Sequence, residues 1–352
     1  MVKSMDRTRV LVVDDSALVR SVITELLSLD PSIDVVGAAV DPYDAREKIK
    51  QLKPDVITLD IEMPKMDGIT FLKNLMKLNP LPVVMLSTLT HAGADATFQA
   101  LELGAVDFIA KPSATASDEG LKVFQEELVE KVKTAASSSS KLKFRRGRSS
   151  ESAVKVDARS ISFRHSAVVA IGSSTGGTEA LNDVISALPK SMPPIIVTQH
   201  IPESFSERFA NRLNRHSELT VVEAKDGDTL KPGYVYIAPG SNHLLVRKHG
   251  HELVCKLDTG KPVNRHKPSV EVMFNSLQEL DVKNITTVML TGMGEDGAEA
   301  MKALVDNGAY SLVQDEATSL VWGMPGAAVR LGAAKEVVAL GKIAQRLVEH
   351  LS

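Results

Sequence analysis

Residues 9–29 read RVLVVDDSALVRSVITELLSL, an apolar run that ends in two acidic residues and is followed by an amphipathic stretch. Strands buried in a parallel sheet are near-continuous apolar runs, whereas a helix repeats its apolar residues at every third or fourth position. Both patterns recur up to residue 136, in YDAREKIKQL (43–52), DVITLD (55–60), GITFLKNLMKL (68–78), VVMLST (83–88) and AVDFIAKP (105–112). The alternation predicts an α/β domain over 8–136, with a doubly wound parallel sheet.

A second domain of the same class is expected over 166–352. Its predicted strands are AVVAIG (167–172), PPIIVTQH (193–200) and ITTVMLTG (285–292), and its predicted helices are STGGTEALNDVISAL (174–188) and GEDGAEAMKALVDNG (294–308). Between 221 and 258, turn signals separate short strand-like runs, so we expect a hairpin-rich insertion there.

Residues 137–165 have a different composition from both halves. They contain nine Ser, eight Lys or Arg and two Asp or Glu, and they show little apolar periodicity. Such a segment cannot bury enough apolar surface to fold, so we expect a flexible linker.

Overall composition narrows the class of protein. The chain has 352 residues, a net charge of −3 and 4% aromatic residues, which argues against binding nucleic acid over its whole surface. The single cysteine, Cys255, excludes an intrachain disulfide framework and a cysteine-cluster metal site. No apolar run approaches the roughly 20 residues of a membrane span, and the first residues lack the apolar core of a signal peptide. We therefore expect a cytoplasmic protein.

Five polar side chains are expected at the carboxyl ends of four strands in the N-terminal domain. They are Asp14 and Asp15 after the first run, Asp60 and Ser87 on two others, and Lys111 after the last. Ligands of such sheets bind beyond these strand ends. Clustered carboxylates repel one another unless a cation joins them, and Mg²⁺ prefers oxygen ligands. The lysine and the hydroxyl would contact phosphoryl oxygens, and the central carboxylate, Asp60, is the expected phosphoryl acceptor.

The segments that carry these residues resemble the receiver domain of response regulators. They are VDDS (13–16), LDIEMPKMDG (59–68), VVMLST (83–88) and FIAKP (108–112). The resemblance implies a flavodoxin-like fold and Mg²⁺-dependent phosphorylation of Asp60 by a histidine kinase. The residues it assigns to the metal ion are Asp14, Asp15, Asp60 and the backbone carbonyl of Glu62. Those it assigns to phosphoryl contact and switching are Ser87, Phe108 and Lys111.

A second set of candidate residues lies in the C-terminal domain. VVAIGSSTGGTEAL (168–181) places two serines between a buried strand and a helix, at a glycine-rich turn. A dinucleotide-binding turn would need glycine at Ser174 and an acidic residue where the next strand ends, at His200. A serine hydroxyl becomes a nucleophile when a base takes its proton, and histidine suits that task. Asp296, in the loop after a later strand, would orient the imidazole.

Residue spacing leaves alternatives open at this site. Ser173 competes with Ser174 as the nucleophile, and His266 in NRHKPS competes with His200 as the base. Serine and aspartate at such places also serve as ordinary helix N-caps. Backbone amides near Thr175 and in the following glycine-rich loop, such as that of Met293, are candidates for an oxyanion hole.

Residues 166–352 resemble the catalytic domain of the CheB family of chemotaxis protein-glutamate methylesterases. The matching segments include AIGSSTGGTEAL (170–181), QHIPESFSERFANRL (199–213), NRHKPSVEVMF (264–274) and LTGMGEDGAEAM (290–301). The resemblance implies that Ser174 is the nucleophile, His200 the base and Asp296 the orienting residue. It also implies hydrolysis of glutamate γ-methyl esters and deamidation of selected glutamines, with no cofactor for the esterase chemistry.

Partners follow from the same resemblance. It implies phosphorylation by the chemotaxis histidine kinase CheA and a substrate on the cytoplasmic helices of methyl-accepting chemoreceptors, without nucleic acid or membrane insertion. A shift between two domain arrangements would let phosphorylation release the esterase. The alternative is a phospho-switched binding or transcription regulator without hydrolase activity, which would require a recognition helix after the linker. A nucleotide-dependent enzyme at the 172–177 turn would instead bind a cofactor saturably.

Overall fold

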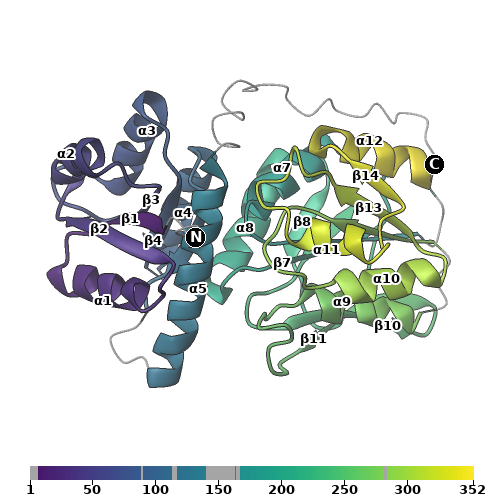
Figure 1. The fold of residues 1–352 in the computed structure, drawn as a ribbon. Coiled ribbons are helices and arrows are strands. Elements are labelled where there is room, and N and C mark those ends of the chain that lie inside the picture. The colour runs from purple at the N-terminus through teal and green to yellow at the C-terminus, as the bar shows by residue number, and fades with distance from the viewer. Residues whose placement is uncertain (1–6, 89, 113–116, 140–162, 164–166, 281–283) are drawn as a thin grey trace, which may run out of the picture. The chain divides into compact units, whose positions relative to one another are not determined.

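The computed structural model describes residues 7–88, 90–112, 117–139, 163, 167–280 and 284–352. The chain divides into two compact units, Met1–Ser149 and Ser150–Ser352, each with its own parallel sheet (Figure 1). Among the described residues, no helix is both long and apolar enough to cross a bilayer.

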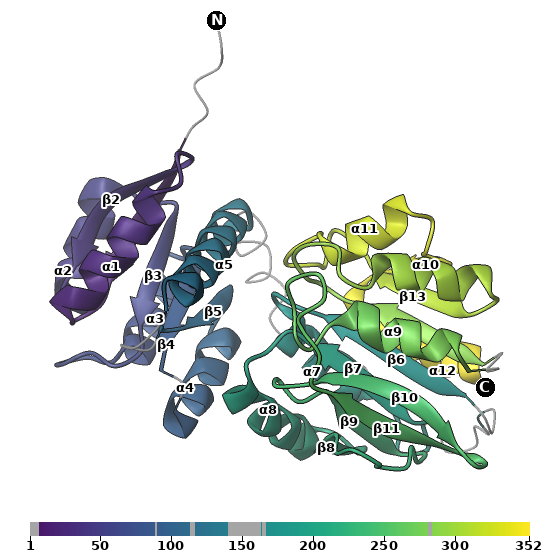
Figure 2. The same cartoon turned by 90° about the horizontal axis from the view of Figure 1, so that it is seen from below.

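The first unit is a doubly wound parallel sheet, as predicted, and it has five strands in the order β2-β1-β3-β4-β5. Its strands are β1 (Thr8–Val13), β2 (Ile33–Ala39), β3 (Val56–Asp60), β4 (Val83–Ser87) and β5 (Asp107–Ala110). Its helices are α1 (Ala17–Ser28), α2 (Pro42–Leu52), α3 (Gly68–Leu78), α4 (His91–Glu102) and α5 (Asp118–Ser137). Helices α1 and α5 lie together on one face, and α3 and α4 lie together on the other (Figure 2).

Buried strands and capped helices explain why this sequence forms these elements. Leu11, Ile57 and Leu59 on β1 and β3 are fully buried, which removes their apolar surface from water. Every helix of this unit begins at a polar side chain that accepts a backbone N–H of the first turn, namely Ser16, Asp41, Asp67, Thr90 and Ser117. Strand β2, which the sequence pattern did not mark, lies at the sheet edge and is only partly buried.

The second unit is built on seven parallel strands in the order β14-β13-β12-β6-β7-β9-β8. These strands are β6 (Val168–Ser173), β7 (Ile195–Gln199), β8 (Thr220–Glu223), β9 (Tyr234–Ile237), β12 (Ile285–Met289), β13 (Tyr310–Gln314) and β14 (Glu336–Val338). The helices are α7 (Gly177–Ala187), α8 (Glu203–His216), α9 (Val270–Gln278), α10 (Ala298–Asp306), α11 (Met324–Arg330) and α12 (Leu340–Leu351). Helices α7 and α12 cover one face, and α9 and α10 cover the other (Figure 1).

The expected hairpin-rich insertion is smaller than predicted. Only β10 (His243–His249) and β11 (Glu252–Asp258) form an antiparallel hairpin outside the main sheet. The runs that form β8 and β9 instead join the main sheet in parallel, where Val235 of β9 pairs with both Val221 and Ile195. Parallel pairing links residues far apart in the chain, so local turn signals did not reveal it.

The predicted linker falls mostly outside the described residues. Helix α5 continues to Ser137, one residue into the predicted linker, and Ser138 is buried at its C-cap. Beyond residue 139, the structure describes only Phe163 of this segment.

Candidate functional site

The carboxyl ends of β6, β7 and β12 adjoin in the centre of the second sheet, and the first of them leads into a tight turn. The backbone N–H of Gly177 donates to the Ser174 carbonyl at 2.7 Å, and the Ser174 N–H donates to the Thr291 carbonyl at 3.1 Å. Gly176 has φ 75°, and a Cβ there would lie 2.9 Å from the Cβ of Leu320. Glycine is therefore needed at this position, both for the left-handed conformation and for the space.

Three predicted side chains converge at this edge. The Nδ1 atom of His200 lies 3.1 Å from Ser174 Oγ, and its Nε2 atom lies 2.9 Å from Asp296 Oδ2. Ser174 follows β6, His200 follows β7, and Asp296 lies in the loop after β12. In the tautomer that carries its proton on Nε2, the Nε2–H donates to the carboxylate and the Ser174 hydroxyl donates to Nδ1, so the imidazole is placed to take the serine proton.

The structure distinguishes the two neighbouring serines. Ser173 is fully buried as the last residue of β6, and its Oγ donates to Gln199 Oε1 at 2.7 Å. The Gln199 Nε2 donates in turn to the carbonyls of Ser174 (2.9 Å) and His200 (3.1 Å). Ser174, and not Ser173, therefore faces the imidazole, while Ser173 and Gln199 brace the turn. Sequence reasoning missed Gln199.

Asp296 is held by groups from several segments. Its Oδ1 accepts from Asn264 Nδ2 and Ser269 Oγ, both at 2.8 Å, and its Oδ2 accepts from the Val270 N–H at 2.7 Å as well as from His200. Burial would raise the pKa of this carboxyl, but the hydrogen bonds from His200, Asn264 and Ser269 outweigh it and lower the pKa to about 2. The group therefore stays anionic beside the imidazole.

The segment before α9 contributes one residue that the sequence analysis considered as an alternative base and two that it did not name. His266, the competing base, lies with its ring stacked on that of His200 at a centroid distance of 3.7 Å. Asn264 and Ser269 were not predicted as site residues. Their proximity in sequence to His266, in NRHKPS, was the available signal.

Both predicted oxyanion-hole segments border Ser174. Thr175 is its chain neighbour, and the Thr175 carbonyl accepts from Thr291 Oγ1 at 3.0 Å. Met293 follows Gly292, where a Cβ would lie 2.9 Å from that of Ser174. The role of these backbone amides as oxyanion donors stays a prediction.

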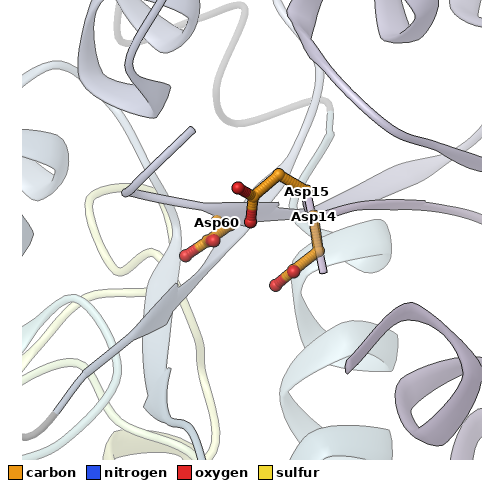
Figure 3. A group of neighbouring side chains, drawn as sticks. All are labelled: Asp14, Asp15 and Asp60. Carbon is orange, nitrogen blue, oxygen red and sulfur yellow. The ribbon is translucent and has the colours of Figure 1, made fainter. Parts of the chain in front are cut away.

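The predicted acidic pocket of the first unit forms at adjacent strand ends. Carboxylate oxygens of Asp14, Asp15 and Asp60 lie within 4.8 Å of one another (Figure 3). Lys111 Nζ lies 2.8 Å from both Asp14 Oδ2 and Asp60 Oδ1. Burial raises the pKa of Asp60 to about 6, and the Asp14 charge adds to this, although the Lys111 hydrogen bond opposes it.

The donor set of this pocket fits a divalent cation. Three carboxylates face one ammonium group, so the pocket carries excess negative charge in an oxygen-rich setting. Hard cations such as Mg²⁺ prefer such ligands. Glu62 contributes a backbone N–H bond to Asp60, whereas a role for its carbonyl stays a prediction.

The other two residues predicted for phosphoryl contact and switching, Ser87 and Phe108, lie on β4 and β5. Ser87 Oγ contacts α4, since it accepts from Thr97 Oγ1 at 2.8 Å and donates to the Gly93 carbonyl at 3.3 Å. Phe108 is buried on β5, and Lys131 Nζ lies 5.3 Å from the centre of its ring.

Two family models match the chain. The one described as CheB methylesterase matches residues 169–347, and the one described as response regulator receiver domain matches residues 10–119.

Relatives resemble the chain over nearly its whole length. A Xanthomonas campestris protein named protein-glutamate methylesterase/protein-glutamine glutaminase 1 is 52% identical over 97% of this chain and 96% of its own length. A Saccharophagus degradans protein, numbered 2 under the same name, is 52% identical over 98% of this chain and 99% of its own length. The solved Thermotoga maritima CheB methylesterase catalytic domain is 38% identical with a TM-score of 0.52, and the match covers 53% of this chain and 100% of that domain.

Proposed function

Since the chain belongs to the CheB methylesterase family, we propose that it is a phosphorylation-activated hydrolase of bacterial chemotaxis. It hydrolyses γ-methyl esters of glutamate side chains and deamidates selected glutamines to glutamate, the two activities in the names of its relatives. Both reactions transfer the same γ-glutamyl acyl group to the enzyme and then to water, so one site serves both. The relatives give no support to the alternative of a regulator without hydrolase activity.

In the proposed reaction, the Ser174 hydroxyl attacks the γ-carbonyl carbon of the substrate. His200 Nδ1, at 3.1 Å, takes the hydroxyl proton as the new C–O bond forms. The bond to the leaving group then breaks, and His200 delivers the proton to the departing oxygen or nitrogen. Methanol or ammonia leaves, and the acyl group stays on Ser174.

Water completes the proposed cycle. It attacks the acyl carbon and gives a proton to His200, and Ser174 Oγ recovers that proton as glutamate departs. Asp296 accepts the Nε2–H and stabilises the imidazolium that forms in each half. The backbone N–H groups of Thr175 and Met293 are the proposed donors to the oxyanion.

Regulation is proposed to act through Asp60. A receiver domain implies a kinase that donates a phosphoryl group, and we propose CheA, with cytoplasmic chemoreceptor helices as the substrate. The Asp60 carboxylate attacks phosphorus, and the bond to the donor histidine breaks. Asp14, Asp15, Asp60 and the Glu62 carbonyl would hold Mg²⁺, which supplies positive charge for the phosphoryl oxygens.

Other residues of the pocket would respond to the phosphoryl group. Lys111, already 2.8 Å from Asp60, is placed to pair with the added oxygens. Ser87 is the proposed hydroxyl contact and Phe108 the proposed switch aromatic.

The observation that carries this proposal is the contact of Ser174, His200 and Asp296, which come from three separate segments. The test measures methanol release from methylated chemoreceptor membranes, with and without acetyl phosphate and Mg²⁺. We expect the phosphodonor to raise turnover and Ser174→Ala to lower it by a factor of about 10³ or more. Ser173→Ala is the comparison variant, and its loss of turnover should be far smaller, because it removes only the bracing hydrogen bond to Gln199. Near-normal turnover in Ser174→Ala would exclude this nucleophile.

A further inference from the structure

A second histidine lies flat against the proposed base. The rings of His200 and His266 are stacked with centroids 3.7 Å apart and planes 15° from parallel. We propose that His266 is a positioning residue that fixes the tilt of the His200 imidazole through this stack. The inference rests on the proposed function, because that function gives His200 its role as the base.

Stacking, and not proton transfer, is the contact that this geometry allows between the rings. The lone pairs and N–H bonds of an imidazole lie in the ring plane. Two nearly parallel rings therefore cannot pass a proton directly from one to the other. His266 acts on His200 through its face, as an aromatic surface.

The hydrogen bonds of His200 leave one motion of its ring open. Ser174 Oγ and Asp296 Oδ2 hold the two nitrogens in the ring plane, at 3.1 Å and 2.9 Å. Rocking of the ring about the in-plane axis that crosses the line between these nitrogens moves them to opposite sides of the original ring plane and changes both distances little. It does, however, swing the Nδ1 lone pair away from the hydroxyl, and proton transfer is sensitive to that direction. A flat surface against the ring opposes this rocking.

The backbone that carries His266 is held in a costly conformation. Val263 and His266 exchange two backbone hydrogen bonds, of 2.9 and 3.0 Å, across a turn of two residues. Those two, Asn264 and Arg265, have φ of 51° and 68° without being glycine. Such conformations persist only where the surroundings enforce them, and they concentrate at functional sites.

This turn delivers two groups to the triad at once. Asn264 Nδ2 donates to Asp296 Oδ1 at 2.8 Å, while His266 lies on His200. One end of the turn thus contacts the orienting carboxylate and the other contacts the imidazole. The turn therefore fixes the position of the His200 imidazole relative to the Asp296 carboxylate.

The test replaces His266 in the full chain by three residues of different shape. His266→Phe keeps a flat aromatic face without ring nitrogens, His266→Leu keeps apolar volume without a face, and His266→Ala removes both. His251→Ala, at an exposed histidine of the β10–β11 hairpin, is the matched control. Thermal unfolding followed by Trp322 fluorescence checks that each variant is folded.

Two rates are measured for each variant with acetyl phosphate and Mg²⁺ present. One is methanol release from methylated receptor membranes, resolved into kcat and KM. The other is labelling of Ser174 by a fluorophosphonate, which requires the base but not the natural substrate. We expect kcat and the labelling rate to fall about two- to tenfold in His266→Ala and His266→Leu, with KM little changed. His266→Phe should stay near the wild type.

Several results would overturn the proposal. Equal losses in the Phe, Leu and Ala variants would mean that the ring nitrogens matter and not the face. A change confined to KM would mean that His266 contacts the substrate and does not position the base. Unchanged rates in all variants would mean that His266 has no role in positioning His200. If the wild type releases no methanol while labelling still ranks the variants as expected, the proposed substrate is wrong and the positioning role stands.

Discussion

At the scale of a residue, the Asp296 carboxylate joins three separate parts of the esterase domain. It accepts hydrogen bonds from His200 after β7, from Asn264 in the turn, and from Ser269 and Val270 at the start of α9. The positive end of α9 adds to the attraction for a negative charge. Asp296, the residue proposed to orient the base, therefore also holds these three segments together.

This arrangement predicts how stability depends on pH. The pKa of Asp296 is about 2 in the folded protein, below its ordinary value of 3.8. The anion therefore stabilises the fold by roughly 2 kcal/mol above pH 4, and this contribution is lost as the pH falls from about 4 toward 2. Chemical unfolding followed by Trp322, the only tryptophan, reports on this domain.

Asp296→Asn removes the titrating group and is the variant to compare. The gap in unfolding free energy between wild type and variant should narrow as the pH falls through that range. Parallel curves for the two proteins would contradict the lowered pKa.

At the level of single residues, the sequence predicted which strand ends carry the site but could not choose between adjacent residues there. Strand ends located Ser174, His200 and Asp296 well, because parallel strands deliver their last residues to one edge. Spacing could not separate Ser173 from Ser174, since the choice depends on which side chain of the strand faces the interior. For Asn264 the sequence offered only its proximity to His266, because its contact with Asp296 depends on a left-handed turn.

At the scale of an element, the start of α3 is packed against the proposed phosphoryl acceptor. The Gly68 N–H donates to the Ile61 carbonyl at 2.9 Å, and a Cβ on Gly68 would lie 2.0 Å from the Asp60 carbonyl oxygen. The added Cβ would clash with the backbone of Asp60, and the clash can be relieved only if Asp60 or the start of α3 moves. Glycine is thus required for the close approach of this helix to the end of β3.

Gly68→Ala should therefore displace Asp60 within its pocket. We expect phosphorylation by acetyl phosphate, measured on phosphate-affinity gels, to fall about tenfold or more, because small displacements are costly for group transfer. Gly341→Ala, where a Cβ would meet nothing within 4 Å, is the matched control. Normal phosphorylation of Gly68→Ala would show that the strand end adapts.

Elements were predicted best where burial was continuous. The central strands β1, β3, β6, β7 and β12 are long apolar runs, and the sequence located all of them. The short strands β8 and β9 were assigned to a hairpin, because turn residues around them are a stronger local signal than pairing with distant β7.

At the scale of the whole molecule, the two chemistries belong to separate compact units. We expect residues 166–352 alone to fold and to hydrolyse receptor methyl esters at a rate that acetyl phosphate does not change. In the full chain, acetyl phosphate should raise turnover, and EDTA should abolish that increase while leaving the basal rate intact. Within the part of the chain that the structure describes, the acidic pocket is the one group of clustered carboxylates that could hold Mg²⁺.

Methanol release measured on both proteins tests this division. A fragment that still responds to acetyl phosphate, or a basal rate of the full chain that EDTA abolishes, would contradict it. Domain class was predictable for both halves from strand and helix alternation alone, whereas the proposed control of the esterase by the receiver domain corresponds to no local sequence pattern.

The β10–β11 hairpin stands outside the main sheet, yet its first residue braces the segment that serves the triad. His243, which is almost fully buried, accepts the Ser269 N–H at Nδ1 (3.1 Å) and donates from Nε2 to the Lys261 carbonyl (2.9 Å). It thereby clamps both ends of the stretch that contains Asn264 and His266. A shortened version of the enzyme that omits this hairpin would lose both hydrogen bonds of His243. The segment that positions Asn264 and His266 would then be held less firmly, although the hairpin itself contributes no residue to the triad.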